Sequence, residues 1–516
     1  MTELNRENIC IGENSIVAFS QAYCEADIIV PDIYPDISKI LQINAAPALV
    51  EKNCSTDRIS IDGRTEIVIL YLGDDECVYS ITSTEQFSHL MEAKGAKEDM
   101  YAEAEVNTDN VDFTVLNPRK LNVKVLIGID ANVTEDVTST VCTSISTDEP
   151  LEILDCTLTP YKTASRVCEQ LCIRESLDIP AGNPSIEKIL CMHVCIRNKE
   201  YSLSTDKMII KGTLQISAVY TGDTDGNIHC AQYEVPFAET IGMPNASEDM
   251  NSRLKLSINR IFYKPEADAD GDNRRIMLEC IITATAKACY KSEITIIKDA
   301  YCTKTPMSVS HEGAFVTRLV CKNSYQLTAK DTAILDNGSP EFFEILNITP
   351  RAYLANAHTE NKKVVIEGII ESDIMYMCAQ PTSPINLHKH QQTFSHTFDL
   401  PDAKEGMLCD VTLDIVHSSY NISLGNEIDL RFVLQIDTDV LANEKIESVS
   451  SLYTDDTQPF EKRKCYCIKV YFAKENDNLW SIAKKHRISK NALMEINNIS
   501  SDTDIYDGKQ LMIPIK

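Results

Sequence analysis

Three stretches of the chain repeat one pattern of proline, isoleucine, glycine and tyrosine at identical spacing. In each stretch the isoleucine lies five residues after the proline, the glycine twenty-three residues after the isoleucine, and the tyrosine eight residues after the glycine. The three copies contain Pro35, Ile40, Gly63 and Tyr71; Pro184, Ile189, Gly212 and Tyr220; and Pro340, Ile345, Gly368 and Tyr376. Because this spacing contains no insertion, we predict that the chain folds as three copies of one unit.

The residues around each repeated glycine predict a strand, because they alternate between apolar and polar and are rich in β-branched side chains. A lone glycine inside a strand is typical of a bend, so we expect one long strand that bends across two sheets. Each copy continues to a phenylalanine (Phe87, Phe237 and Phe398) and then to a second alternating run (121–133, 276–290 and 428–440). Each unit is therefore expected to be a β-sandwich or barrel-like fold of about eight strands.

The segments that follow the copies also resemble one another, so each unit is expected to include a trailing segment. Residues 297–301 after the second copy resemble 449–453 after the third, and 153–156 after the first more faintly. The predicted organisation is mainly β, with units at 1–165, 166–318 and 319–455, a linker at 456–465 and a small domain at 466–516.

The net charge of −28 argues against nucleic acid as a partner, because a polyanion is bound by clustered Lys and Arg. It argues equally against an anionic membrane surface. The first residues are polar and acidic, and no run of eighteen apolar residues follows, so we expect neither a signal peptide nor membrane insertion, and a cytoplasmic location. In that compartment the nineteen cysteines are expected to stay reduced.

The last fifty or so residues follow a fixed order of short elements. Val470–Phe472 fits a strand, Asp477 or Asn478 fits the cap of a helix that runs through Ala483, and Ser489 fits the cap of a second helix. Residues 507–508 then turn into a last strand at 511–515, and Leu479, Ile482, Ala483 and His486 are expected to face the core.

This segment resembles a LysM domain along its whole length, and the resemblance implies a β-α-α-β fold. The family carries a glycine before the aspartate, where this chain has Asn476, and asparagine tolerates a positive φ better than most residues.

Trp480 is the only tryptophan of the chain, and two roles are weighed equally for it. It could steady the small core of this domain, or it could anchor a partner, as exposed tryptophans often do. Ile468 is a second apolar candidate for the same binding surface. The candidate partner-binding residues are Trp480, Ile468, Asn476, Asp477, Asn498, Ile499 and Tyr506.

The chain shows no constellation of catalytic residues. Cys168, Cys172, Cys191, His193 and Cys195 could suggest zinc, but their spacings are not those of usual zinc sites, so structural thiols are expected. The P-loop, G-x-S-x-G and H-E-x-x-H motifs are all missing. We therefore predict no catalytic residue, no metal site, no cofactor and no enzymatic activity.

The repeated blocks, the acidic body and the C-terminal LysM-like segment together resemble the SPOCS-domain proteins of endospore-forming bacteria. The nearest type is the clostridial partner of the spore-coat morphogenetic ATPase. This resemblance implies a non-enzymatic scaffold in the mother cell, which docks through its LysM domain on that ATPase at the forespore surface and recruits other coat proteins. The alternative is the ordinary LysM role, which is to bind N-acetylglucosamine-containing peptidoglycan of the cortex or cell wall; the missing export signal argues against it.

Overall fold

The computed structural model describes residues 3–335, 342–378, 384–423, 426–454, 468–501 and 504–514. Within these ranges nearly every regular element is a strand, and all strand pairs are antiparallel. The predicted linker at 456–465 and Pro340 of the third repeat lie outside the described residues.

Each repeat folds into two three-stranded sheets that pack face to face. The sheet orders are β2-β3-β4 and β1-β6-β5 in unit 1, β9-β10-β11 and β8-β13-β12 in unit 2, and β16-β17-β18 and β15-β20-β19 in unit 3. The mainly β prediction is confirmed, but among the described residues the two packed sheets of each unit together hold six strands and not eight. Unit 1 comprises β1 (Glu3–Ile29), β2 (Ile37–Ser55), β3 (Arg58–Gly73), β4 (Val78–Glu92), β5 (Tyr101–Asn117) and β6 (Lys120–Ser146). Unit 2 comprises β8 (Tyr161–Asp178), β9 (Ile186–Ser204), β10 (Lys207–Gly222), β11 (Ile228–Gly242), β12 (Asn251–Ala267) and β13 (Asn273–Lys291). Unit 3 comprises β15 (Met307–Ile334), β16 (Phe342–Glu360), β17 (Lys363–Cys378), β18 (Ile385–Asp399), β19 (Leu408–Ile422) and β20 (Glu427–Thr454).

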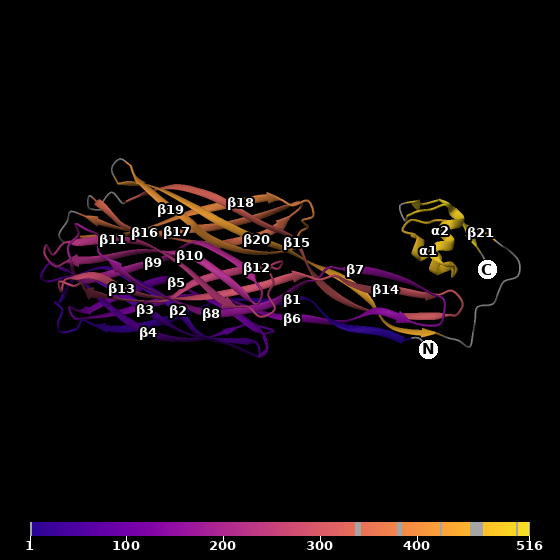
Figure 1. Ribbon diagram of the computed structural model, residues 1–516, viewed down its shortest axis with the longest axis horizontal. Coiled ribbons are helices and arrows are strands. Elements are labelled where there is room, and N and C mark those ends of the chain that lie inside the picture. The colour runs from indigo at the N-terminus through magenta and orange to yellow at the C-terminus, as the bar shows by residue number, and fades with distance from the viewer. Residues whose placement is uncertain are drawn as a thin grey trace.

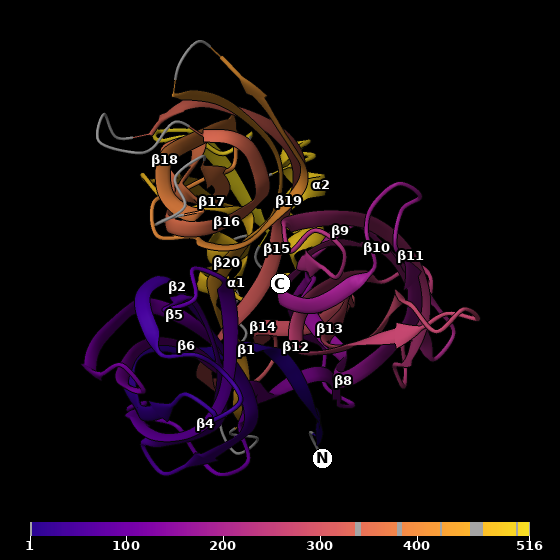
Figure 2. The same cartoon turned by 90° about the vertical axis from the view of Figure 1, so that its left-hand side faces the viewer.

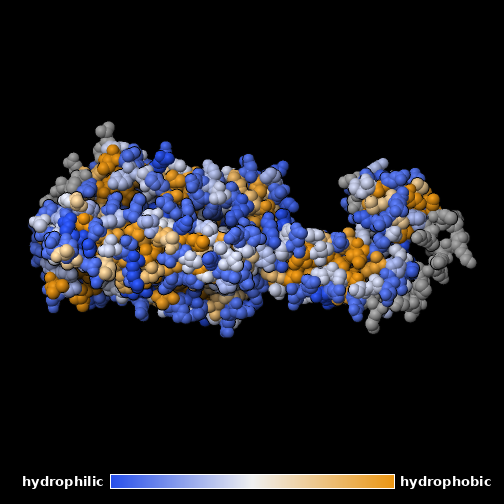
Figure 3. Space-filling view, in the orientation of Figure 1, coloured by the Kyte–Doolittle hydropathy of each residue, from blue (hydrophilic) through white to orange (hydrophobic). Residues whose placement is uncertain are grey.

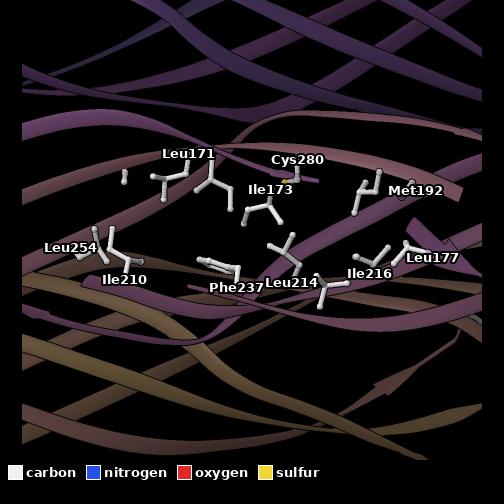
Figure 4. Close-up of a cluster of buried hydrophobic side chains, with 14 of the residues drawn as sticks. Leu171, Ile173, Leu177, Met192, Ile210, Leu214, Ile216, Phe237, Leu254 and Cys280 are labelled. Atoms are coloured by element: carbon white, nitrogen blue, oxygen red, sulfur yellow. The ribbon is translucent and has the colours of Figure 1, made fainter. Parts of the chain in front are cut away.

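The core of each unit lies between its two sheets and is filled by every second residue of the central strands. In unit 2, Ile210, Leu214 and Ile216 of β10 pack with Ile173 of β8 and Cys280 of β13 (Figure 4). This alternation follows from the two-residue period of a strand, which points successive side chains to opposite faces.

The repeated glycine makes room for an aromatic ring on the neighbouring strand. Gly212 is paired with Phe237, and a Cβ added at this glycine would lie 2.6 Å from Cζ of that ring. Gly63 with Phe87 and Gly368 with Phe394 repeat the arrangement. The predicted bend across two sheets is therefore wrong, because each glycine strand stays in one sheet. The third phenylalanine is Phe394 and not Phe398, because Phe394 is the residue in register with the glycine.

The repeated tyrosine ties the strand to the proline that opens its own repeat. The hydroxyl of Tyr71 donates to the carbonyl oxygen of Pro35 at 3.1 Å, and that of Tyr220 donates to Pro184 at 3.3 Å. Both tyrosine rings are fully buried in the cores of their units. In units 1 and 2 the repeated spacing between proline and tyrosine thus reflects a hydrogen bond that burial makes costly to lose.

The three units pack around a common centre, as the end-on view shows (Figure 2). Leu70, Val219 and Met375 each precede the repeated tyrosine, so they point out of their own unit and meet in one apolar cluster. Equivalent residues after the repeated isoleucine join them, with Leu190 and Leu346 fully buried and Leu41 packed against the cluster. The central strands are therefore apolar on both faces where one face packs within the unit and the other packs against the neighbouring units.

Beyond this body, one two-stranded ribbon from each unit continues into a shared stalk (Figure 1). The ribbons are the outer ends of β1 and β6, the pair of β7 (Leu151–Leu158) and β14 (Ile294–Cys302), and the outer ends of β15 and β20. Apolar side chains of all three ribbons fill the stalk interior: Ile9, Ile11, Val141, Leu158, Ile296, Val316 and Ile446.

Each ribbon has a β-bulge at an equivalent place, which aligns the ribbons residue by residue. The bulged residues are Thr143, Lys298 and Ser450, and the residues before them, Cys142, Ile297 and Val449, form one buried cluster. The predicted match of 297–301 with 449–453 is confirmed by this alignment. The match with 153–156 is wrong: those residues lie in β7 of the second ribbon, and the equivalent segment of unit 1 is 142–146.

The predicted boundaries at 165 and 318 fall inside β8 and β15. The first strand of the packed sheets begins at Tyr161 in unit 2 and at Met307 in unit 3. Strand β7 precedes Tyr161 in the sequence and pairs with β14 in the ribbon of unit 2. The boundaries at which each unit would fold as an independent domain stay a prediction.

A small cavity of about 80 Å³ lies between unit 2 and unit 3. Polar side chains line it, among them His193, Cys195, Ser217, Asn347 and Ser419. The Nε2 atom of His193 is shielded from solvent and has no hydrogen-bond partner among the described residues. Burial lowers the pKa of His193 to about 4; the charge of Asp373 opposes this shift and that of Arg351 adds to it. His193 is therefore neutral in the folded chain.

The free energy of unfolding is expected to fall on mild acidification because of His193. Below its ordinary pKa the unfolded state takes up a proton that the folded state refuses, so stability decreases as the pH drops toward the folded pKa. For a histidine shifted to this value, the loss is about 2 kcal/mol between about pH 7.5 and pH 5. Denaturant titrations of the full chain and of His193→Gln over this range measure it. Parallel curves for the two proteins would contradict the buried, neutral histidine.

Candidate functional site

The C-terminal domain folds as β21 (Ile468–Phe472), α1 (Leu479–His486), α2 (Lys490–Asn497) and β22 (Gln510–Pro514). The two strands pair in an antiparallel sheet, so the predicted β-α-α-β order is confirmed. Leu479, Ile482, Ala483, Leu493, Leu511 and Ile513 fill its core and are almost fully buried. His486 is half-buried, its ring packs against Tyr471, and burial lowers its pKa, which agrees with its predicted inward position.

Asn478 caps α1, and Ser489 caps α2 through its side chain. Asp477, the other predicted cap, instead closes the preceding turn: its carboxylate accepts from the Tyr471 hydroxyl at 2.7 Å and from the Lys474 amide at 2.9 Å. The amide hydrogen bond in particular holds the pKa of Asp477 below its usual value. Asn476 has a φ of 70°, the positive value expected where the family carries glycine.

Trp480 is covered by the stalk, and only 9% of it is exposed. Its indole Nε1 donates to Oδ2 of Asp299 in β14 at 2.8 Å, and its ring packs against that of Tyr301 in a T-shaped contact with a centroid distance of 4.9 Å. Lys484, one helical turn later, places Nζ at 2.7 and 2.6 Å from the two carboxylate oxygens of Asp299. The role of Trp480 inside this chain is thus contact between domains.

The contact extends on both sides of this tryptophan. The hydroxyl of Tyr301 donates to the carbonyl oxygen of Ile488 at 2.7 Å, and Glu152 of β7 accepts from the amide of Lys490 at 3.3 Å. Burial would raise the pKa of Asp299, but hydrogen bonds from Lys484 and Trp480 outweigh this effect and hold that pKa below its usual value. Asp299 is therefore a charged acceptor, and its hydrogen bonds to the LysM domain are charge-assisted.

The outer face of the β21–β22 sheet presents apolar side chains to solvent. Alternate residues of β21 share this face, and Met512 of β22 is paired with the middle one. We call this set the LysM sheet face: Ile468, Val470, Phe472 and Met512. All four side chains are exposed, Phe472 to 60%. Apolar atoms are visible on the outer side of this domain in the space-filling view (Figure 3).

The remaining predicted residues lie apart from the contact with the stalk. Asn476, Asn498 and Tyr506 are exposed in the loops that join strands and helices, and Asn498 ends α2 in a left-handed conformation. Ile499 is buried in the core of the domain. The structure thus separates Ile468, on the outer sheet face, from Trp480, on the helix side of the same domain.

The sequence analysis missed two sets of residues: the other members of the LysM sheet face, and the stalk residues that contact Trp480. Val470, Phe472 and Met512 could have been found from strand alternation, which places every second residue of β21 on one face. Asp299 and Tyr301 gave no such signal, because each precedes the LysM residue with which it forms a hydrogen bond by more than 180 positions.

No group of His, Cys, Asp or Glu side chains able to hold a metal ion occurs among the described residues. Of Cys168, Cys172, Cys191 and Cys195, the first two are exposed on β8 and Cys191 is buried on β9. In the described part of the chain, no helix has the length and apolar character needed to cross a membrane.

Comparison with family models assigns both parts of the chain. The model described as "SipL, SPOCS domain" matches residues 36–116, 185–266 and 343–423, and the LysM domain model matches residues 471–514. Searches of curated proteins and of solved structures returned no match. Both are non-catalytic domain families, and together they fit a sporulation-related protein whose LysM domain belongs to a peptidoglycan-binding family. The chain therefore belongs to the SPOCS-domain proteins, with three SPOCS domains followed by one LysM domain.

Proposed function

We propose that this chain is a non-enzymatic scaffold of endospore coat assembly, which docks through its LysM domain on a coat morphogenetic ATPase at the forespore surface. The domain set supports this role, and so does the body, in which three SPOCS units share one apolar centre. The mother-cell cytosol is the compartment in which such a scaffold would meet the ATPase and recruit other coat proteins.

The exposed LysM sheet face is the observation that carries the proposal. Exposed apolar side chains gathered on one face are typical of a surface that another protein covers. A sugar polymer, in contrast, carries many hydroxyl groups that need hydrogen-bond partners, which apolar side chains do not supply. Ile468 lies on this face directly, while Trp480 becomes available to a partner only when the domain leaves the stalk.

Peptidoglycan is the second candidate ligand, and the LysM family match favours it. The loops that carry Asn476, Asn498 and Tyr506 stay exposed beside the docked stalk, so a glycan could reach them. The two ligands would thus use different sides of one domain, which makes them separable by substitution.

Phe472→Glu is expected to weaken binding of the purified coat morphogenetic ATPase to the full chain by at least about tenfold. The reason is that a charge replaces an apolar side chain that the partner would desolvate. Ile468→Glu should act in the same direction. Binding is measured by surface plasmon resonance, and Glu495→Gln on the exposed side of α2 serves as the control for a distant LysM substitution.

The same proteins are tested for retention on insoluble peptidoglycan. Under the scaffold proposal the sheet-face variants lose the ATPase, and Tyr506→Ala does not. Wild-type chain that is retained by peptidoglycan and does not bind the ATPase would refute docking on the ATPase. Unchanged ATPase binding by both glutamate variants would remove the sheet face from the proposal.

A further inference from the structure

The three stalk ribbons share one backbone arrangement, but among the described residues the hydrogen bonds to the LysM domain all come from the ribbon of unit 2. Counted from the bulge, Ser144, Asp299 and Ser451 occupy one position, and Ser146, Tyr301 and Tyr453 occupy a second. Unit 2 alone has a carboxylate at the first position. Tyr453 of unit 3 is 69% exposed, whereas its equivalent Tyr301 is buried under the LysM domain. Asp299 is therefore the residue that distinguishes the occupied ribbon.

The LysM surface around Trp480 has a defined chemical requirement. The indole N–H and the Lys484 ammonium converge on one carboxylate, and the Trp480 ring makes a T-shaped contact with a tyrosine ring. A protein segment that presents a carboxylate beside an aromatic ring fits this surface. Since residues 455–467 link the domain to β20, the ribbon competes for the surface as an intramolecular ligand at an effective concentration of about millimolar.

We infer that Glu152, Asp299 and Tyr301 form a docking site that holds the LysM domain closed and covers the Trp480 surface until an outside protein displaces the ribbon. The identity of the outside protein rests on the proposed function, whereas the closed state rests on the observed contacts between the LysM domain and the stalk. The closed state leaves exposed both the LysM sheet face and the loops that carry Asn476, Asn498 and Tyr506. An incoming partner can therefore first engage the sheet face and then take the Trp480 surface from the ribbon.

Docking lowers the apparent affinity of any ligand that needs the Trp480 surface. The apparent dissociation constant rises by the factor by which closed chains outnumber open ones. A substitution that opens the chain should lower the apparent dissociation constant by the same factor. The affinity of a ligand that binds only the exposed loops should not change.

Asp299→Ser in the full chain tests the docking site, because serine is the residue that both other ribbons carry at this position. Trp480 is the sole tryptophan, so its fluorescence reports this contact directly. We expect a red-shifted emission and stronger quenching by acrylamide in Asp299→Ser than in wild type. Ser451→Ala, at the equivalent position of unit 3, should match wild type. Asp299→Lys combined with Lys484→Asp should restore much of the protection that Asp299→Lys alone removes.

Binding of the purified coat ATPase then tests the competition. Asp299→Ser is expected to bind it between about threefold and tenfold more tightly than wild type. Equal quenching of Trp480 in wild type and Asp299→Ser would overturn the docking site, and an opened Trp480 without any gain in ATPase affinity would overturn the competition. If neither protein binds the ATPase, the proposed function fails, and the quenching and charge-swap results decide the docking site by themselves.

Discussion

Leu190→Glu is expected to lower the free energy of unfolding of the full chain by about 4 kcal/mol or more. Leu190 is fully buried where the three units meet, so the substitution removes an apolar side chain and places an unpaired charge there. Loss of a buried leucine alone costs about 2–5 kcal/mol, and burial of an unpaired charge adds several more unless the structure opens. Separation of the units would expose the carboxylate to water and so remove the cost of burying its charge.

Denaturant titration and limited proteolysis measure this effect. Leu90→Glu is the matched control, because Leu90 is an exposed leucine of β4 and the same chemical change there should alter stability by less than about 0.5 kcal/mol. We expect Leu190→Glu also to unfold in more than one transition, since units that no longer share a core lose cooperativity. A single transition at the wild-type midpoint would show that the central cluster does not couple the units.

Gly368→Ala is expected to destabilise unit 3 by about 3 kcal/mol through overpacking. A Cβ at this position would lie 2.4 Å from Cζ of Phe394 and 2.5 Å from the carbonyl oxygen of Tyr353. The ring can turn away, but the carbonyl belongs to the paired strand β16 and cannot move without breaking the ladder. Gly212→Ala should cost less, because the nearest backbone atom there, the carbonyl oxygen of Arg197, is 3.5 Å away.

Double mutants distinguish destabilisation caused by the clash with the phenylalanine ring from destabilisation caused by the clash with the backbone carbonyl. Phe237→Leu should relieve most of the cost of Gly212→Ala, whereas Phe394→Leu should relieve little of the cost of Gly368→Ala. Gly313→Ala, on β15 of the same unit, meets its nearest atom at an ordinary 3.6 Å and should be tolerated. Melting temperatures of the full chain provide the comparison, and equal rescue at both sites would contradict the backbone argument.

The repeat pattern predicted three copies of a β unit, and local physical rules explain why. Strand period and β-branched composition act within a few residues, so 59–71, 208–220 and 364–376 could be assigned from the sequence. The role of the glycine could not, because Phe87, Phe237 and Phe394 stand opposite it only through strand register. A glycine in a strand indicates close approach of another group, and the register decides which group that is.

The arrangement of the units was also beyond a sequence pattern. Leu70, Val219 and Met375 look like ordinary strand residues, and nothing local distinguishes a face that packs on another unit from one that meets solvent. The outward-facing role of these residues became clear only because the three sets meet in one cluster at the centre.

The LysM domain shows the same division between sequence and tertiary structure. Its elements, the cap of its second helix at Ser489 and the positive φ at Asn476 could be predicted, since caps and turns depend on neighbouring residues, whereas the sequence left Asp477 and Asn478 open as the cap of the first helix. Whether Trp480 faces a partner or a core could not be decided, because the answer depends on Asp299 and Tyr301 in a distant ribbon. The sequence by itself thus determined three SPOCS units and a LysM domain, through interactions of short range. Only the tertiary structure decided which strands pair in which register, which units share a core and which ribbon contacts the LysM domain, because these contacts join residues well beyond the range of local sequence patterns.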